Sequence, residues 1–247
     1  MSPRPLEDEM AEYYANVETY SPEAQVKHQE PLVPCYDALL GKVARHRSPG
    51  TLLDVGCGVG VFLKRAAEAG WDVAGTEGSP LLADFASQYT GRRVYSCTDL
   101  REAEIEPGTL DVITFLHVLE HVSDPVDTLR TAVSLLRPGG LVVGQVPNQY
   151  LDAWARLPVV RGHVSRMSEK TKTNLHHLAF FTPSTFKHLF EEAGLIVEYE
   201  STYALSNRRH MASSRFPLLS WPKRGLYSLS GPLGFGPVIE LYGRAPA

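Results

Sequence analysis

The chain has 247 residues, of which 43% are hydrophobic and 21% charged, and its formal net charge is −4. This composition fits a globular protein with a sizeable core, and the acidic balance excludes a generally nucleic-acid-like surface. No window approaches the roughly 18 apolar residues that a membrane-spanning helix needs. The three cysteines (Cys35, Cys57 and Cys97) are sparse, and the first residues lack the basic and apolar stretches of a secretory signal, so a cytoplasmic location is expected.

The chain from residue 50 onward alternates short apolar runs with amphipathic stretches, which predicts βαβ units and a mostly parallel sheet. A hairpin-like return of the last two strands would give this sheet an antiparallel edge. The expected strands cover residues 51–56, 71–77, 92–97, 110–116, 141–148, 195–204 and 237–245.

Helix starts are marked by a capping side chain followed by proline, whose missing N–H costs nothing at the first helical position. The helix that starts at Asp124-Pro125 is expected to end at Pro138-Gly139-Gly140. Residues 1–49 are also expected to be largely helical, with Ser21 as a cap. The three cap-proline pairs are Ser79-Pro80, Asp124-Pro125 and Thr182-Pro183.

Two segments interrupt the alternation of strands and helices. Residues 149–181 and 205–236 are both longer than ordinary connections, so they are expected to be functional caps. We therefore expect one domain over residues 1–247. It would comprise a helical leader (1–49), a ligand-binding half (50–148) and the two cap insertions.

The most informative stretch is LLDVGCGVGVF, residues 52–62, in which a strand, a glycine turn and a helix follow one another. Gly56, Gly58 and Gly60 would let a bulky ligand approach the backbone and would allow positive φ. The third glycine of a dinucleotide-binding fingerprint is replaced by Val61, and no Walker sequence is present. The same glycines could also serve only a tight turn.

Two carboxylates frame this glycine turn. Glu77 ends the second expected strand, where it could accept hydrogen bonds from both hydroxyls of a ribose. Asp54 puts a negative charge just before the turn, where a phosphate-binding loop would avoid one. The pair indicates a ligand with a ribose and a cationic group.

The motifs DVGCGVG, GTEGS, SCTDL, LDVITFLHVLEHVSDP and LLRPGGLVVGQVPN occur in this order. Together they resemble the class I S-adenosylmethionine-dependent methyltransferases, over about residues 50–204. The resemblance is strongest to the branch of ubiquinone-biosynthesis-type and natural-product methyltransferases that act on small molecules. It implies an α/β fold with a doubly wound, mostly parallel seven-stranded Rossmann-like sheet, an antiparallel last strand, and S-adenosylmethionine as cofactor.

The resemblance also implies where the methionine part and the ribose of the cofactor lie. Gly56 and Gly58 would lie against the methionine portion, and Asp54 would lie near its amino group. Glu77 would hold the ribose.

The adenine end and the closing segment are implied in the same way. Asp99 would accept a hydrogen bond from the adenine N6 amine, with Leu100 packed nearby, although an aspartate at a strand end is often only a turn or cap residue. The backbone around Leu116 and His117 would close over the methionine end.

The pentapeptide HVLEH, residues 117–121, spells the H-x-x-E-H pattern of some zinc peptidases. That chemistry requires His117 and His121 on one face of a continuous helix. A strand is expected before the motif and a helix start at Asp124 directly after it, so only a turn fits between them. The peptidase interpretation is therefore disfavoured.

A turn at the carboxyl end of the fourth expected strand would face the ligand site of an open α/β sheet. Methyl transfer to a hydroxyl needs a group that takes its proton, and an imidazole, which titrates near neutral pH, suits that task. The candidate bases are His117, His121 and His177, with His176 a weaker one. His177 could equally be an ordinary loop residue.

A metal site is not predicted at this turn. The resemblance associates an acid-x-x-Glu-His arrangement at this position with a divalent metal, but His117 replaces the first acid. A softer site with nitrogen and oxygen ligands, which could hold zinc, is the less favoured alternative. Glu120 and His121 could instead brace or cap the following helix.

The acceptor is expected to be a small molecule, anionic or aromatic. Residues 150–224 contain eleven Lys/Arg and six Asp/Glu, interleaved with aromatic side chains, whereas the rest of the chain is acidic. A nucleic-acid surface ranks lower, because no RNA- or DNA-binding module accompanies the basic excess. A cofactor-binding protein without turnover, methylation of nitrogen or carbon, and a nicotinamide-dependent oxidoreductase are the alternatives. The sequence does not indicate an oligomeric state.

Overall fold

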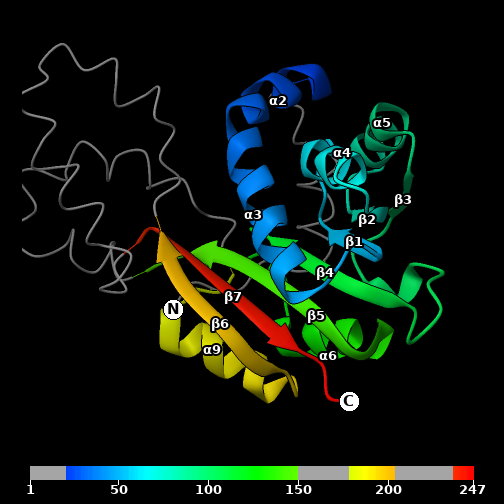
Figure 1. The fold of residues 1–247 in the computed structure, drawn as a ribbon. Coiled ribbons are helices and arrows are strands. Elements are labelled where there is room, and N and C mark those ends of the chain that lie inside the picture. Colours follow the sequence, from blue (N-terminus) through cyan, green and yellow to red (C-terminus); the bar gives the residue numbers. More distant parts are fainter. Residues whose placement is uncertain (1–20, 150–177, 204–235) are drawn as a thin grey trace, which may run out of the picture.

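The computed structural model describes residues 21–149, 178–203 and 236–247. In this part of the chain seven strands form one sheet, in the order β3-β2-β1-β4-β5-β7-β6 (Figure 1). All neighbouring pairs are parallel except those of β7, which runs antiparallel to both β5 and β6. The predicted seven-stranded, doubly wound sheet with an antiparallel last strand is confirmed. The strands are β1 (Thr51–Val55), β2 (Asp72–Glu77), β3 (Arg93–Ser96), β4 (Leu110–Leu116), β5 (Leu136–Pro147), β6 (Ile196–Tyr203) and β7 (Val238–Arg244).

The expected antiparallel pairing of the last two strands is confirmed, since β7 pairs with β6 at one edge of the sheet. β7 inserts between β5 and β6, which leaves β6 outermost. One expected helix boundary is wrong. The helix after Asp124 ends at Leu135 rather than at Pro138-Gly139-Gly140, and β5 begins at the next residue. Pro138 disfavours helical backbone at the residue before it, and Leu136 pairs with Leu110 of β4 instead.

Helix starts follow the predicted caps. Ser21, Ser79, Asp124 and Thr182 each accept a hydrogen bond from a backbone N–H in the first turn, and a proline follows each of them. The helices are α2 (Pro22–Gln29), α3 (Val33–His46), α4 (Val61–Glu68), α5 (Pro80–Thr90), α6 (Pro125–Leu135) and α9 (Pro183–Glu192), with short 3₁₀ turns η1 (Glu30–Leu32) and η2 (Leu100–Glu102).

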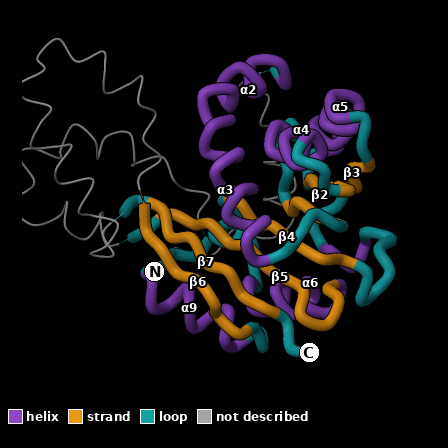
Figure 2. Tube along the Cα trace, in the orientation of Figure 1, coloured by secondary structure: helices purple, strands orange, loops and turns teal. Residues whose placement is uncertain are grey.

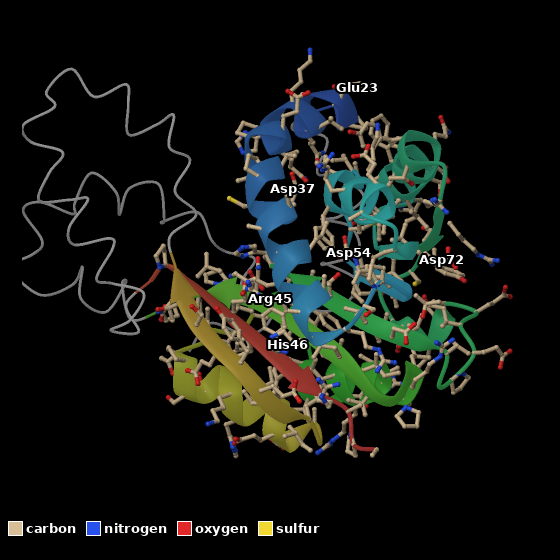
Figure 3. All side chains as sticks on the ribbon, viewed as in Figure 1. Glu23, Asp37, Arg45, His46, Asp54 and Asp72 are labelled. Carbon is tan, nitrogen blue, oxygen red and sulfur yellow. The ribbon has the colours of Figure 1, made fainter. Side chains whose placement is uncertain are left out.

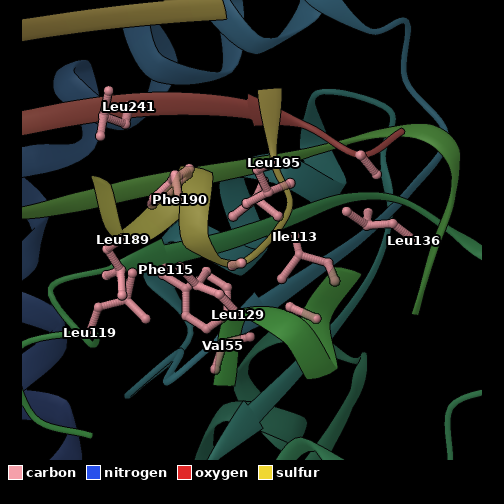
Figure 4. Packing of buried hydrophobic residues seen from close by; sticks show 14 of the residues in the cluster. Val55, Ile113, Phe115, Leu119, Leu129, Leu136, Leu189, Phe190, Leu195 and Leu241 are labelled. Carbon is pink, nitrogen blue, oxygen red and sulfur yellow. The ribbon is translucent and has the colours of Figure 1, made fainter. Parts of the chain in front are cut away.

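Helices cover both faces of the sheet (Figure 2). Leu39, Val43 and Phe62 of α3 and α4 pack on one face with Val143 and Tyr242 of the strands. On the other face, shown in Figure 4, α6 and α9 bury a second cluster that includes Phe115, Leu129, Phe186, Phe190 and Leu241.

None of the helices in the described part of the chain has the length and hydrophobicity needed to span a bilayer.

The amino ends of β1 and β4 are tied to the end of α3 by Asp111. Its carboxylate accepts hydrogen bonds from Arg47 at 2.6 Å, from the Thr51 amide at 2.9 Å and from Arg137 at 3.2 Å. Burial alone would raise the pKa of Asp111. The bonds from Arg47 and Thr51 and the charge of Arg137 outweigh burial and lower that pKa to about 2.

Replacing Asp111 with asparagine is expected to lower the free energy of unfolding by about 2 kcal/mol at pH 7. Because the folded-state pKa lies below the ordinary value of 3.8, this stability is present above about pH 4 and is lost as the pH falls towards 2. Denaturant unfolding at several pH values measures the difference. Glu104→Gln, at a carboxylate that is 86% exposed, is the control. An Asp111→Asn deficit that does not change between pH 7 and pH 2 would contradict the assignment.

Candidate active site

The glycine turn between β1 and α4 has the backbone that its sequence predicts. Gly56, Gly58 and Gly60 have φ of 66°, 55° and 81°, in the left-handed region that favours glycine. A Cβ on Gly56 would lie 2.7 Å from Val118 Cγ2, so position 56 has no room for a side chain. At Gly58, the Gln29 Nε2 atom lies 3.9 Å from such a Cβ, and no other atom of the described residues outside the turn lies within 4 Å of it.

Asp54 lies near the carboxyl end of β1 and is 3% exposed (Figure 3). One of its oxygens accepts a hydrogen bond from Thr114 Oγ1 of β4 at 2.6 Å. Burial raises the pKa of Asp54 to about 7, and the charge of Glu77 adds to the rise, while the Thr114 hydrogen bond lowers it. Among the described residues no ion pair joins this carboxylate to a cation, so its charged form would gain from a cationic ligand.

Glu77 is the last residue of β2, and its carboxylate stabilises the glycine turn by hydrogen bonding. Its Oε2 accepts a hydrogen bond from the Gly58 amide and its Oε1 accepts one from the Ser79 amide, both at 2.9 Å. Burial raises the pKa of Glu77, and these backbone hydrogen bonds oppose the rise. Each carboxylate oxygen can accept a second hydrogen bond, so the predicted ribose contact remains available.

The HVLEH segment forms a turn between β4 and α6, as predicted, and not a helix. His117 has φ of 61° and is the only described non-glycine residue with positive φ. Its amide donates to the Gln145 carbonyl of β5 at 2.9 Å, which anchors the turn to the neighbouring strand. Because His117 and His121 do not share a helix, the peptidase geometry is absent from this turn.

A buried carboxylate accompanies His117. Glu120 is 2% exposed, its Oε1 lies 3.4 Å from His117 Nδ1, and its Oε2 has no hydrogen-bond partner among the described residues. The Glu120 carbonyl accepts hydrogen bonds from the amides of Leu178 and Ala179, where the chain returns from the first insertion. The alternative that Glu120 caps the next helix is wrong, because Asp124 does so.

The remaining predicted residues are placed as follows. The His121 amide donates to Val118 within the turn, at 2.8 Å. Asp99 caps η2 and accepts hydrogen bonds from the amide and the side chain of Arg101, so the alternative role of Asp99 as a cap is observed. Leu100 is buried in the core and Leu116 is half-buried at the end of β4. His177 and most of both insertions lie outside the described residues.

The fold brings the glycine turn, Asp54, Glu77 and the His117 turn to one edge of the sheet. The contact between Gly56 and Val118 joins two of these segments directly, and Thr114 links Asp54 to β4. The sequence did not predict the roles of Val118 and Thr114, because a valine or a threonine is not distinctive of a ligand site. This edge holds the carboxyl ends of the parallel strands, where open α/β sheets bind ligands.

A family model described as a methyltransferase domain matches residues 26–200. The chain belongs to this family of methyltransferases. The predicted class I S-adenosylmethionine-dependent methyltransferase is therefore confirmed at the level of the family and the fold.

Individual methyltransferases resemble the chain over different lengths. A ubiquinone biosynthesis O-methyltransferase from Idiomarina loihiensis is 31% identical over 64% of this chain and 63% of its own length, so the match spans less than two thirds of that relative. The methyltransferase chain in a complex with the Haloferax volcanii Trm112 activator has a TM-score of 0.65 and 19% identity, covering 98% and 100% of the two chains. A Burkholderia thailandensis 1,6-didemethyltoxoflavin-N1-methyltransferase has a TM-score of 0.63 and 16% identity, covering 100% and 93%.

Proposed function

We propose that this methyltransferase transfers a methyl group from S-adenosylmethionine to a hydroxyl oxygen of a small molecule, with His117 as the general base. The observation that carries the proposal is the position of His117. It follows β4 at the ligand edge of the sheet, its Nδ1 lies against the buried Glu120, and the adjacent Val118 packs on Gly56 of the glycine turn.

The residues of the turn fit the proposed cofactor. Gly58 leaves space beside the backbone, the Asp54 carboxylate suits the ammonium group of a methionine moiety, and Glu77 retains lone pairs for ribose hydroxyls. When bound, S-adenosylmethionine supplies a methyl group activated by a positively charged sulfur and leaves as S-adenosylhomocysteine.

The His117–Glu120 pair fits the proton transfer that a hydroxyl acceptor requires. With Nδ1–H directed at the Glu120 carboxylate, the basic nitrogen of His117 is Nε2. As the acceptor oxygen forms its bond to the methyl carbon and the carbon–sulfur bond breaks, the hydroxyl proton passes to Nε2. The buried negative charge of Glu120 stabilises the imidazolium that results. His121 and His177 remain alternative bases in this proposal.

The choice of oxygen is supported by the name of the Idiomarina relative, an O-methyltransferase. A small anionic or aromatic acceptor is supported by the basic and aromatic side chains of residues 150–224, and a cytoplasmic location by the free cysteines Cys35, Cys57 and Cys97. The proposed adenine contacts of Asp99 and Leu100, the closure by Leu116 and the single-domain layout are part of the same proposal.

Replacing Glu77 with alanine is expected to weaken binding of S-adenosylhomocysteine about 10- to 100-fold, because the ribose contact and the support of the Gly58 amide are lost together. Titration calorimetry measures the affinity. Glu102→Ala, at an exposed carboxylate, is the control. Unchanged binding by Glu77→Ala would remove Glu77 from the proposed ribose site.

The proposed reaction is tested by incubating the protein with methyl-labelled S-adenosylmethionine and paired sets of phenols, carboxylated phenols and the corresponding anilines. Mass spectrometry locates the label in the product. We expect label on oxygen and a preference for acceptors that carry a negative charge. Label only on nitrogen or carbon would overturn the choice of oxygen, and cofactor binding without any transfer would favour a non-catalytic binding protein.

A further inference from the structure

We infer that Gln29 of α2, held in place by Tyr36 of α3, binds the carboxylate of the cofactor's methionine moiety, so that these two helices complete the cofactor site. The inference rests on the proposed function and assigns α2 and α3 a part in it. A methionine moiety carries an ammonium group and a carboxylate. Asp54 suits the ammonium group but repels the carboxylate, which therefore needs its own hydrogen-bond donor.

The glycine turn has few amides to offer such a carboxylate. The Gly56 and Cys57 amides donate to Thr76 Oγ1 and O, at 3.4 and 2.9 Å. The Gly58 amide donates to Glu77 Oε2 at 2.9 Å, and the Gly60 amide donates to the Cys57 carbonyl at 3.0 Å. These four amides hold the turn together, so a side chain from another segment would add a donor that the turn itself does not offer at these positions.

Gln29 is that donor. It ends α2, which Figure 1 shows above α4. Apart from Gly58 and its chain neighbours, Gln29 Nε2 is the only atom of the described residues within 4 Å of the point where a Cβ on Gly58 would lie, at 3.9 Å. The Gln29 amide nitrogen thus lies next to the position that a side chain on residue 58 would occupy.

Tyr36 sets the orientation of this amide. Its hydroxyl donates to Gln29 Oε1 at 3.4 Å, which directs Nε2 and its two hydrogens towards Gly58. The Tyr36 ring packs edge-on against Phe62 of α4, with ring centroids 5.5 Å apart. Burial, together with the charge of Asp54, raises the pKa of Tyr36 to about 12, so the hydroxyl remains a donor.

The test compares two ligands that differ only in the carboxylate: S-adenosylhomocysteine and its decarboxylated analogue, which keeps the ammonium group. Calorimetry on the full chain gives both affinities for the wild type, Gln29→Ala, Gln29→Glu and Tyr36→Phe. His28→Ala, at an exposed neighbour on α2, is the control. Circular dichroism verifies that each variant is folded.

Gln29→Ala is expected to weaken S-adenosylhomocysteine about tenfold and Gln29→Glu about 100-fold, while the decarboxylated analogue changes less than about twofold in either variant. Tyr36→Phe should show a smaller loss with the same selectivity. Equal losses for both ligands, or no loss, would overturn the role of Gln29. If the wild type binds neither ligand, the proposed function itself fails.

Discussion

Asp54→Asn is expected to weaken binding of S-adenosylhomocysteine about 100-fold or more and to make the ligand-free protein more stable above pH 7. The loss of affinity follows from removing a buried negative charge opposite the ligand's ammonium group. The gain in stability follows from burial of a carboxylate that is 3% exposed and that pairs with the neutral Thr114 hydroxyl.

The sign of the stability effect comes from the pKa of Asp54. Its folded-state value of about 7 lies above the ordinary 3.8, so the folded protein holds a proton that the unfolded chain has already released. The carboxylate therefore destabilises the fold increasingly as the pH rises from about 4 to about 7, by on the order of a few kcal/mol. The neutral asparagine avoids this penalty.

Thermal unfolding at pH 5 and pH 8, together with calorimetry of ligand binding, measures both effects. Asp72→Asn, at an exposed carboxylate labelled in Figure 3, is the control for charge removal. Cofactor binding to the wild type should also release protons near pH 6.5, because the ligand's ammonium group favours the ionised Asp54. An Asp54→Asn protein that is less stable at pH 8, or that binds the ligand as well as the wild type, would contradict the assignment.

His117→Asn is expected to lower turnover about 10²- to 10⁴-fold, while binding of S-adenosylhomocysteine changes only a few-fold. Asparagine is the suitable replacement because it tolerates positive φ and lacks a basic nitrogen. His188→Asn, at an exposed histidine of α9, is the control.

Glu120→Gln separates the base from the residue that positions it. It should reduce turnover less than His117→Asn does, because the basic nitrogen remains while the imidazolium loses its buried counter-charge. Full activity in His117→Asn would transfer the role of base to His121 or His177. The corresponding single substitutions would decide between those two.

Local patterns were sufficient to predict most of the fold. The cap-proline pairs at Ser79, Asp124 and Thr182 identified helix starts correctly, since each signal lies within four residues. The placement of β7 between β5 and β6 could not be predicted in this way. It depends on pairing residues such as Gln145 and Glu240, which are far apart in the sequence.

The sequence predicted those candidate residues whose type and spacing indicate a chemical role. It did not predict the residues whose role depends on packing between distant segments. Asp54 and Glu77 were predicted as site candidates because a charge beside a glycine turn is informative, and the structure places both beside that turn. The contacts of Thr114 with Asp54 and of Val118 with Gly56 join segments about 60 residues apart and involve ordinary side chains. The sequence did not predict Gln29 for a related reason. Because α2 buries no residue, no apolar stripe in its sequence indicates which face lies towards the glycine turn.

The central claim is that the glycine turn, Asp54 and Glu77 form a site for S-adenosylmethionine. Titration of the full chain with S-adenosylhomocysteine and, separately, with NAD tests it most directly. We predict one equivalent of S-adenosylhomocysteine bound per chain, with affinity that rises through about pH 7, and no response to NAD. Tight binding of NAD without a response to S-adenosylhomocysteine would contradict the account.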